Sequence, residues 1–262
     1  ETSKVFNSIV HKLKTQPKVW HFAANSDIEK GLKNPRIDLQ NTFMTTFNLL
    51  ENCEKHKINS FYFASSSAIY GDHKNSSLKE SSGPLMPISN YGAMKLASES
   101  ICFASLESFL SELRIFRFPN VVGSPATHGV IFDFIKKLIA NPKELKVLGN
   151  GLQKKSYLHI DDLVDGMIYL ANLELKQDCN PIFNLGSNKD LVSVKFIAEE
   201  TVNLISPNAK IIYGKEDRGW LGDVPCFAYN TEKSKLAGWT PYFNSKEAIL
   251  KAIREISIQL SL

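Results

Sequence analysis

Residues 61–65 read FYFAS and residues 114–118 read RIFRF, and the segment from Tyr91 to Leu110 between them has the pattern of one long helix. The two short segments are rich in aromatic and apolar side chains, which is typical of buried strands. A helix between two strands lets both strands run in the same direction, because it returns the chain to the starting edge of the sheet. This part of the sequence therefore predicts two parallel strands joined by a helix.

The same alternation extends toward the amino terminus. Residues 3–15 have apolar side chains at helical spacing, residues 18–23 form a short apolar strand, and residues 41–57 return to the helical period. Helices that alternate with strands predict a parallel sheet covered on both faces. We therefore expect an α/β protein in which residues 1–125 form a doubly wound parallel sheet.

The remaining residues, 126–262, follow a looser pattern and predict a smaller mixed α/β lobe. Asp161 is expected to be the N-cap of one helix in this lobe, and residues 181–187 are expected to rejoin the main sheet. The predicted helices are 129–140, 161–173, 193–206 and 245–258, and the predicted strands are 146–148, 156–160 and 181–185.

The composition excludes several classes of protein. Hydrophobic residues make up 43% of the 262 residues and charged residues 22%, which is ordinary for a globular protein and unlike a disordered chain. No apolar run approaches the ~20 residues that a membrane helix needs. A net charge of +4, spread evenly, gives no reason to expect a nucleic-acid partner. The four cysteines are far apart, so we expect reduced thiols in a cytoplasmic protein and no metal site.

Tyr91-Gly-Ala-Met-Lys95 is the sequence's strongest chemical signal. Residues four apart share one helical face, and a nearby ammonium favours the phenolate, so Lys95 is expected to lower the pKa of Tyr91 and make it a usable acid and base. A tyrosine and a lysine four residues apart often occur by coincidence, so this spacing alone is weak evidence. Ser66, however, precedes Tyr91 by 25 residues and follows a predicted strand, at the sheet edge where doubly wound proteins bind ligands. There its hydroxyl could donate a hydrogen bond to a substrate oxygen.

Nine segments, in order, resemble the extended short-chain dehydrogenase/reductases. More narrowly, they resemble the nucleotide-sugar epimerases and dehydratases of the UDP-glucose 4-epimerase type, which have a Rossmann-like fold. Each segment is weakly specific by itself, but together they extend over nearly the whole chain. They are HFAA (21–24), SSSAIYG (65–71), YGAMK (91–95), RFPNVVG (117–123), GNG (149–151), KSYLHIDD (155–162), FNLGS (183–187), GDV (222–224) and GWTP (238–241).

One feature of that family is missing from these 262 residues. The family begins with a strand, a glycine-rich turn and a helix that bind the cofactor pyrophosphate, and none of the 14 glycines here forms such a turn. The resemblance therefore implies an N-terminally truncated chain that lacks the first βαβ unit and by itself binds dinucleotide poorly. The residue that would select NAD over NADP is expected in the missing part.

The resemblance assigns roles residue by residue. Ser66, Tyr91 and Lys95 match the catalytic residues, and Lys95 also holds the nicotinamide ribose. The implied cofactor is NAD, with NADP left open, and the residues expected near it besides Tyr91 and Lys95 are Ala23, Ala24, Asn41, Phe118 and Pro119. The implied substrate is a nucleotide-diphosphate sugar, and the residues expected to contact it besides Ser66 are Asn120, Lys155, Arg218 and Asp223. His21 and His159 are expected to be structural. Whether the protein is a homodimer is left open.

The resemblance also suggests a reaction. Dehydrating and decarboxylating relatives carry acidic residues just after the catalytic serine or threonine, whereas this chain has Ser67 and Ala68. We therefore expect epimerisation at C4 of the sugar through a transient 4-keto sugar, with proton transfer by Tyr91 and hydride transfer by the nicotinamide. A nucleotide-sugar reductase or dehydratase and a non-catalytic nucleotide-binding relative are the alternatives.

Overall fold

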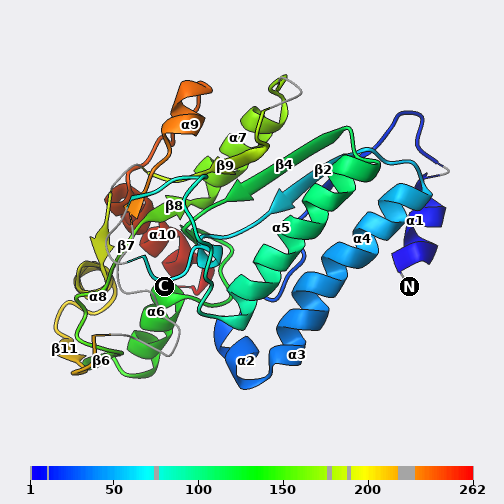
Figure 1. The fold of residues 1–262 in the computed structure, drawn as a ribbon. Helices are drawn as coiled ribbons and strands as arrows, with labels where there is room; N and C mark the ends of the chain where they lie inside the picture. Colours follow the sequence, from blue (N-terminus) through cyan, green and yellow to red (C-terminus); the bar gives the residue numbers. More distant parts are fainter. Residues whose placement is uncertain are drawn as a thin grey trace. The chain divides into compact units, whose positions relative to one another are not determined.

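The computed structural model describes residues 2–10, 12–73, 77–175, 179–187, 190–217 and 228–261. The chain forms two compact units, whose elements are drawn in Figure 1. The first unit comprises Glu1–Asp72, Glu80–Arg117 and Leu173–Phe183, and the second comprises His73–Lys79, Phe118–Asn172 and Asn184–Leu262.

The first unit is built on a four-stranded sheet in the order β1-β2-β4-β9. β1 pairs with β2 and β2 with β4, both in parallel, so that Phe61 lies between Val19 and Leu113. The predicted parallel sheet is confirmed, and each of its four strands was predicted to within two residues at either end. The strands are β1 (Lys18–His21), β2 (Ser60–Ala64), β4 (Glu112–Arg117) and β9 (Ile182–Asn184).

Two long helices, α4 (Met44–Lys55) and α5 (Asn90–Ser108), lie side by side against the sheet (Figure 1). α5 begins one residue before the predicted start at Tyr91, because the Ser89 side chain is its N-cap and accepts a hydrogen bond from the backbone N–H of Gly92, at 3.1 Å. The first helix, α1 (Thr2–Val10), packs on α4. It was expected to extend to residue 15, but the polar residues after Val10 offer little apolar surface to bury.

Three short elements between β1 and α4 were not predicted. They are α2 (Ile28–Lys33), α3 (Pro35–Asp38) and the π-helix η1 (Leu39–Phe43), which leads directly into α4. The first two are too short to show a hydrophobic period, but each begins with a side-chain cap. Asp27 accepts from the backbone N–H of Lys30, and Asn34, followed by Pro35, accepts from that of Arg36.

All five residues of β2 are buried, as expected for a strand covered on both faces. His21, next to this core, is also buried, and its Nε2 lies 2.9 Å from Thr46 Oγ1. That hydroxyl donates its proton to the carbonyl of Thr42, so Nε2 must donate to it and the ring is neutral. Burial lowers the pKa of His21 to about 4, and the Lys95 ammonium contributes. The core contains Leu50, Cys53, Ile58, Phe61, Phe63, Cys102, Leu110, Leu113, Ile115 and Ile182.

His21 is expected to make the first unit sensitive to acid. Between pH 6.5 and about 4 the unfolded chain binds a proton at His21 and the folded chain does not, so stability falls as the pH falls through this range. The loss attributable to this ring is up to about 3 kcal/mol. Urea unfolding at pH 7.5 and 4.5 should show a smaller acid loss in His21→Gln than in the unmodified protein. His128→Gln, at an exposed position, is the control, and equal acid losses in both variants would contradict this role of His21.

The described residues of the second unit form four two-stranded sheets. Three are parallel (β5 with β8, β6 with β11, β3 with β12) and one is antiparallel (β7 with β10). The strands are β3 (Ser77–Leu78), β5 (Asn120–Val122), β6 (Glu144–Val147), β7 (Lys154–Lys155), β8 (Tyr157–His159), β10 (Val192–Ser193), β11 (Lys210–Tyr213) and β12 (Ala228–Tyr229). The helices are α6 (Val130–Ala140), α7 (Ile160–Ala171), α8 (Val194–Ile205), α9 (Glu232–Leu236) and α10 (Ser245–Gln259).

Apolar faces of α6, α8 and α10 meet in the core of this unit. α7 begins one residue earlier than predicted, and its N-cap is His159 instead of Asp161. His159 Nδ1 accepts from the backbone N–H of Asp161 at 3.2 Å, which leaves the Asp161 carboxylate in the first turn, where the helix dipole favours it.

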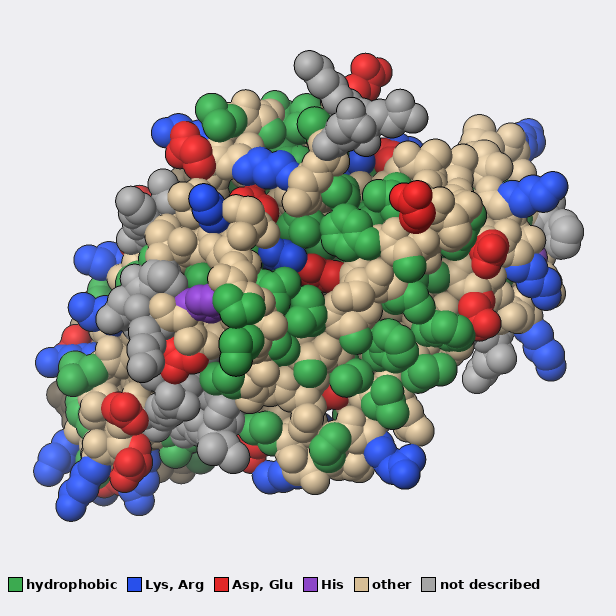
Figure 2. Space-filling model, in the orientation of Figure 1, with side chains coloured by type: hydrophobic (Ala, Val, Ile, Leu, Met, Phe, Trp, Pro, Cys, Tyr) green, Lys and Arg blue, Asp and Glu red, His purple; other side chains and the backbone are tan. Residues whose placement is uncertain are grey.

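The surface agrees with the mild charge of the sequence. On the face drawn in Figure 2, lysine and arginine side chains are dispersed among acidic and neutral ones. Among the described residues, no helix has both the length and the apolar character of a membrane span.

Candidate active site

The Ser66 turn lies at the carboxyl end of β2. The chain leaves the strand at Ala64, and Ser66 has extended backbone angles of φ −155° and ψ 154°. Its hydroxyl oxygen accepts from the backbone N–H of Ala68 at 3.2 Å and so caps the 3₁₀-helix η2 (Ser67–Ile69). This cap fixes the position of the Ser66 side chain at the edge of the sheet.

Tyr91 and Lys95 lie on successive turns of α5, as the spacing predicts. The Lys95 ammonium is buried, donates to the carbonyl of Ala64 at 2.6 Å and lies 5.9 Å from the centre of the Tyr91 ring. The Ser66 hydroxyl interacts with the Tyr91 hydroxyl and lowers the pKa of that phenol. The structure therefore brings Ser66, Tyr91 and Lys95 together within the first unit.

The predicted effect of Lys95 on Tyr91 is wrong for the protein without ligands. Burial raises the pKa of Tyr91 to about 12, the hydrogen bond from Ser66 opposes this rise, and the Asp38 carboxylate adds to it. The Lys95 ammonium, which donates to the Ala64 carbonyl and lies 5.9 Å from the ring centre, is not among the groups that shift this pKa. Tyr91 is therefore a neutral phenol at neutral pH.

Lys95 responds to burial in the opposite direction. Burial lowers the pKa of Lys95 to about 8, while the Glu99 carboxylate and the Cys102 side chain oppose the shift. A buried ammonium with a pKa near neutrality changes its charge easily when a nearby group changes.

A buried carboxyl that sequence reasoning missed lies next to this site. Asp38 is fully buried, and its Oδ1 accepts from the Asn25 side chain at 2.7 Å. Its Oδ2 has no hydrogen-bond partner among the described residues. It packs so closely on Gly31 that a Cβ there would lie 1.9 Å from it. Asn34-Pro35 could have indicated the helix that carries Asp38, but no sequence pattern indicated its burial.

A buried ion pair was also missed. Arg117 at the end of β4 binds Glu99 on α5 with Nη2 2.7 Å from Oε2, and both side chains are 3% exposed. Glu99 follows Lys95 by four residues, so the spacing of Tyr91, Lys95 and Glu99 placed all three on one helical face. A carboxylate on a buried helical face requires a partner, so the position of Glu99 was the signal in the sequence that could have indicated a buried ion pair.

Three of the expected cofactor residues lie at the carboxyl end of β1 and in η1. Ala23 is exposed and Ala24 half-buried, directly after β1, and Asn41 is exposed in the π-helix. The backbone N–H of Asn25 donates to Thr42 Oγ1 at 3.1 Å, which ties the loop after β1 to η1.

The other expected contacts belong to the second unit. Phe118 is half-buried, Pro119 is buried near Gly186, and Asn120 is exposed as the first residue of β5. Lys155 ends β7, opposite Val192 of β10. Arg218 and Asp223 lie outside the described residues.

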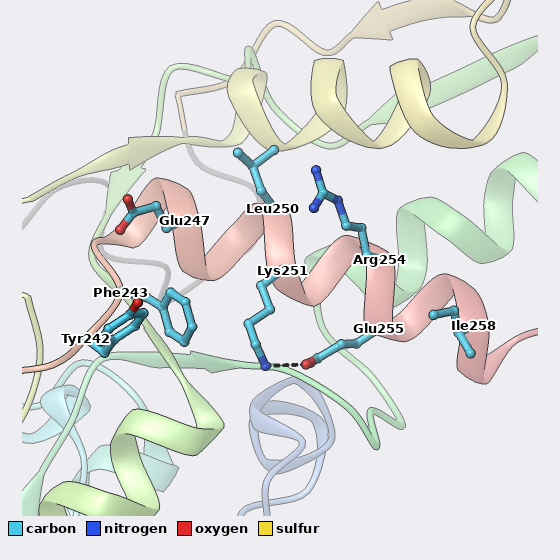
Figure 3. A pocket seen from close by; sticks show the side chains of 8 residues that line it. All are labelled: Tyr242, Phe243, Glu247, Leu250, Lys251, Arg254, Glu255 and Ile258. Atoms are coloured by element: carbon cyan, nitrogen blue, oxygen red, sulfur yellow. Dashed lines mark hydrogen bonds and ion pairs between the residues drawn. The ribbon is translucent and has the colours of Figure 1, made fainter.

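An open pocket of about 690 Å³ lies along α10, apart from all these residues. Figure 3 shows the Lys251 ammonium pointing to Glu255, and it also lies 2.8 Å from Asp161 Oδ2. His159, Asp161 and Glu255 could together hold a metal ion, but the Lys251 ammonium already balances the two carboxylates. None of the predicted site residues is in this pocket, which is lined by Tyr242, Phe243, Glu247, Leu250, Lys251, Arg254, Glu255 and Ile258.

Comparison with known proteins gives a consistent result. The sequence profile of the "NAD dependent epimerase/dehydratase family" matches residues 7–186. The GDP-mannose 3,5-epimerase of Arabidopsis thaliana is 33% identical over 230 residues, which cover 82% of this chain and 58% of that protein. The chain spans between 58% and 64% of the length of the GDP-mannose 3,5-epimerases that it matches.

Solved structures agree. The crystal structure of a UDP-galactose 4-epimerase has a TM-score of 0.82 and 33% identity, covering 95% of this chain and 80% of that chain. A second structure, the protein MoeE5 in complex with UDP-glucuronic acid and NAD, has a TM-score of 0.82 and 25% identity, covering 98% of this chain and 84% of that chain.

Proposed function

Since the chain belongs to the NAD dependent epimerase/dehydratase family, we propose that the whole protein is an NAD-dependent nucleotide-sugar epimerase that inverts C4 through a transient 4-keto sugar. The observation that carries this proposal is the grouping of Ser66, Tyr91 and Lys95 at the carboxyl end of β2. Of the two solved relatives described above, one is a UDP-galactose 4-epimerase and the other is in complex with UDP-glucuronic acid and NAD.

Each of the three side chains has one proposed role. Tyr91 acts as its phenolate, which the positive charge of an oxidised nicotinamide would favour against burial; the phenolate accepts the proton of the sugar 4-hydroxyl and later returns it. The Ser66 hydroxyl donates a hydrogen bond to the reacting oxygen, and it already favours the phenolate of Tyr91. Lys95 provides positive charge close to the Tyr91 ring, which further favours the phenolate once proton transfer begins.

The cofactor is proposed to lie along the carboxyl end of β1. Ala23, Ala24 and Asn41 would border it in the first unit, and Phe118 and Pro119 are the residues proposed for it in the second. When bound, NAD supplies the hydride acceptor and the positive charge of its oxidised ring. Asn120, Lys155, Arg218 and Asp223 are proposed to contact the nucleotide-diphosphate part of the substrate.

The turn after Ser66 favours epimerisation over dehydration. Dehydration needs one group that removes a proton from C5 and another that protonates the leaving hydroxyl. Ser67 and Ala68 form the 3₁₀-turn at this point, and neither side chain titrates near neutral pH. A second candidate is inversion at C3 and C5, which the 33% identity to the Arabidopsis GDP-mannose 3,5-epimerase supports.

The direct test is incubation of the whole protein with NAD and a panel of UDP-, GDP-, CDP- and dTDP-sugars, followed by NMR of the products. The proposal requires that one pair of C4 epimers interconverts without added reductant. Formation of a C3 or C5 epimer, or release of reduced cofactor in proportion to product, would count against it.

A further inference from the structure

The turn that carries Ser66 is fixed at both ends by one buried ion pair. At its start, the Ser65 hydroxyl donates to Glu99 Oε1. At its end, Arg117 Nη1 donates to the Tyr70 hydroxyl at 3.0 Å. All of these residues belong to the first unit. Ser66 therefore lies on a segment of six residues, 65–70, whose first and last side chains bind the two partners of the pair.

The pair itself is bidentate and fully buried. Arg117 Nε lies 3.0 Å from Glu99 Oε1, and Nη2 lies 2.7 Å from Oε2. Arg117 Nη1 also donates to the carbonyl of Glu80 at 3.0 Å. A planar guanidinium bound in this way at several atoms has little freedom to rotate, so the pair is a rigid support.

Glu99 is also connected to Lys95. The two residues are four apart on α5, and the Glu99 carboxylate raises the pKa of Lys95 against the effect of burial. The other described groups that interact with Lys95 are the Ala64 carbonyl, the Cys102 thiol on α5, the neutral His21 ring on β1 and the Phe63 and Tyr91 rings. Among them, Glu99 provides the negative charge at neutral pH, because burial keeps Cys102 protonated.

We infer that Glu99, through its pair with Arg117, is a positioning residue for the proton-transfer site: it holds the Ser66 turn against α5 and places its carboxylate one helical turn from Lys95, on the same face of the helix. Glu99 acts through Ser65, Arg117 and Lys95 and need not touch substrate or cofactor. The effect of this arrangement on turnover rests on the proposed function, whereas its effect on the charge of Lys95 does not.

The first test removes the two ends of the support without leaving a buried charge unpaired. Ser65→Ala and Tyr70→Phe are each expected to lower kcat by roughly 10- to 100-fold, because a small displacement of a reacting group has effects of that size. The affinity for dinucleotide should change less than twofold.

Ser98→Ala is the matched control, since Ser98 is fully buried on α5, the helix that carries Glu99, and its hydroxyl has no described partner. Values of kcat for Ser65→Ala and Tyr70→Phe equal to that of Ser98→Ala would overturn the positioning role.

The second test needs no turnover. NMR of ¹³C-labelled lysine side chains can follow the titration of Lys95 in the 262-residue chain, with the signal assigned by its loss in Lys95→Arg. In Glu99→Gln the midpoint should fall by roughly 1–3 pH units, because an opposite charge is removed. In Glu99→Asp, which retains the charge, it should fall by less. An unchanged midpoint in folded Glu99→Gln would overturn the inference. If Glu99→Gln does not fold, Glu99→Asp and Ser65→Ala decide the inference. It then requires a Lys95 midpoint in Glu99→Asp that differs from that of the unmodified chain, and a lowered kcat in Ser65→Ala. If the whole unmodified protein has no epimerase activity but Glu99→Gln lowers the Lys95 midpoint as expected, the proposed function is contradicted and the inference about Glu99 is not.

Discussion

Replacing Tyr91 by Phe is expected to lower the turnover of the whole protein by roughly 10²–10⁴-fold, the range that general acid–base groups contribute. The change removes only the hydroxyl whose pKa Ser66 lowers, and it leaves the ring beneath the Lys95 ammonium. At the turn, Ser67 and Ala68 carry no phenolate or carboxylate that could replace this hydroxyl. Steady-state kcat and KM with the reactive nucleotide sugar measure the effect.

The fold and the cofactor affinity should survive this change. Dinucleotide affinity and melting temperature are therefore expected to remain close to those of the unmodified protein. Tyr242→Phe is a matched control, because Tyr242 is 84% exposed and lies in the second unit. A Tyr91→Phe protein with kcat within a few-fold of the Tyr242→Phe protein would exclude Tyr91 as the proton-transfer group.

The sequence predicted the elements that bury large apolar side chains. β2 and β4 were found because their aromatic and branched residues leave no alternative to a covered strand. α2 and α3 were missed because six and four residues cannot display a helical period, although their caps were visible in the sequence. The π-helix between Leu39 and Phe43 depends on packing against α5 and has no pattern of its own.

The candidate site was predictable in its membership but not in its electrostatics. Spacing placed Lys95 one turn from Tyr91, and the structure confirms that neighbourhood. Whether the Lys95 ammonium or burial has the larger effect on the pKa of Tyr91 depends on what else the ammonium binds. Here it donates to the Ala64 carbonyl, so burial dominates. Glu99 is 34 residues from Ser65, Arg117 is 52 from it, and the two are 18 from each other, so only the fold could pair them.

Turnover in deuterated water is expected to leave every carbon of the sugar free of deuterium. In C4 inversion, bound NAD would hold the hydrogen of C4 as a hydride, which does not exchange with solvent. The 4-hydroxyl proton, carried by Tyr91, exchanges as every hydroxyl proton does, and that label is lost again on work-up. UDP-glucose with UDP-galactose is the first substrate pair to examine by NMR and mass spectrometry.

The competing reactions leave different labels because they break different bonds. Inversion at C3 and C5 next to a C4 ketone removes carbon-bound protons, so deuterium would enter at both carbons. Dehydration would place deuterium at C5 or C6 and yield a stable 4-keto-6-deoxy sugar. Each of these reactions needs a base for a carbon-bound proton in addition to Tyr91, and Ser67 and Ala68 at the turn do not provide one. Label at C3 and C5 would therefore show that another side chain performs this task and would replace C4 inversion by 3,5-epimerisation. A stable keto sugar would restore dehydration.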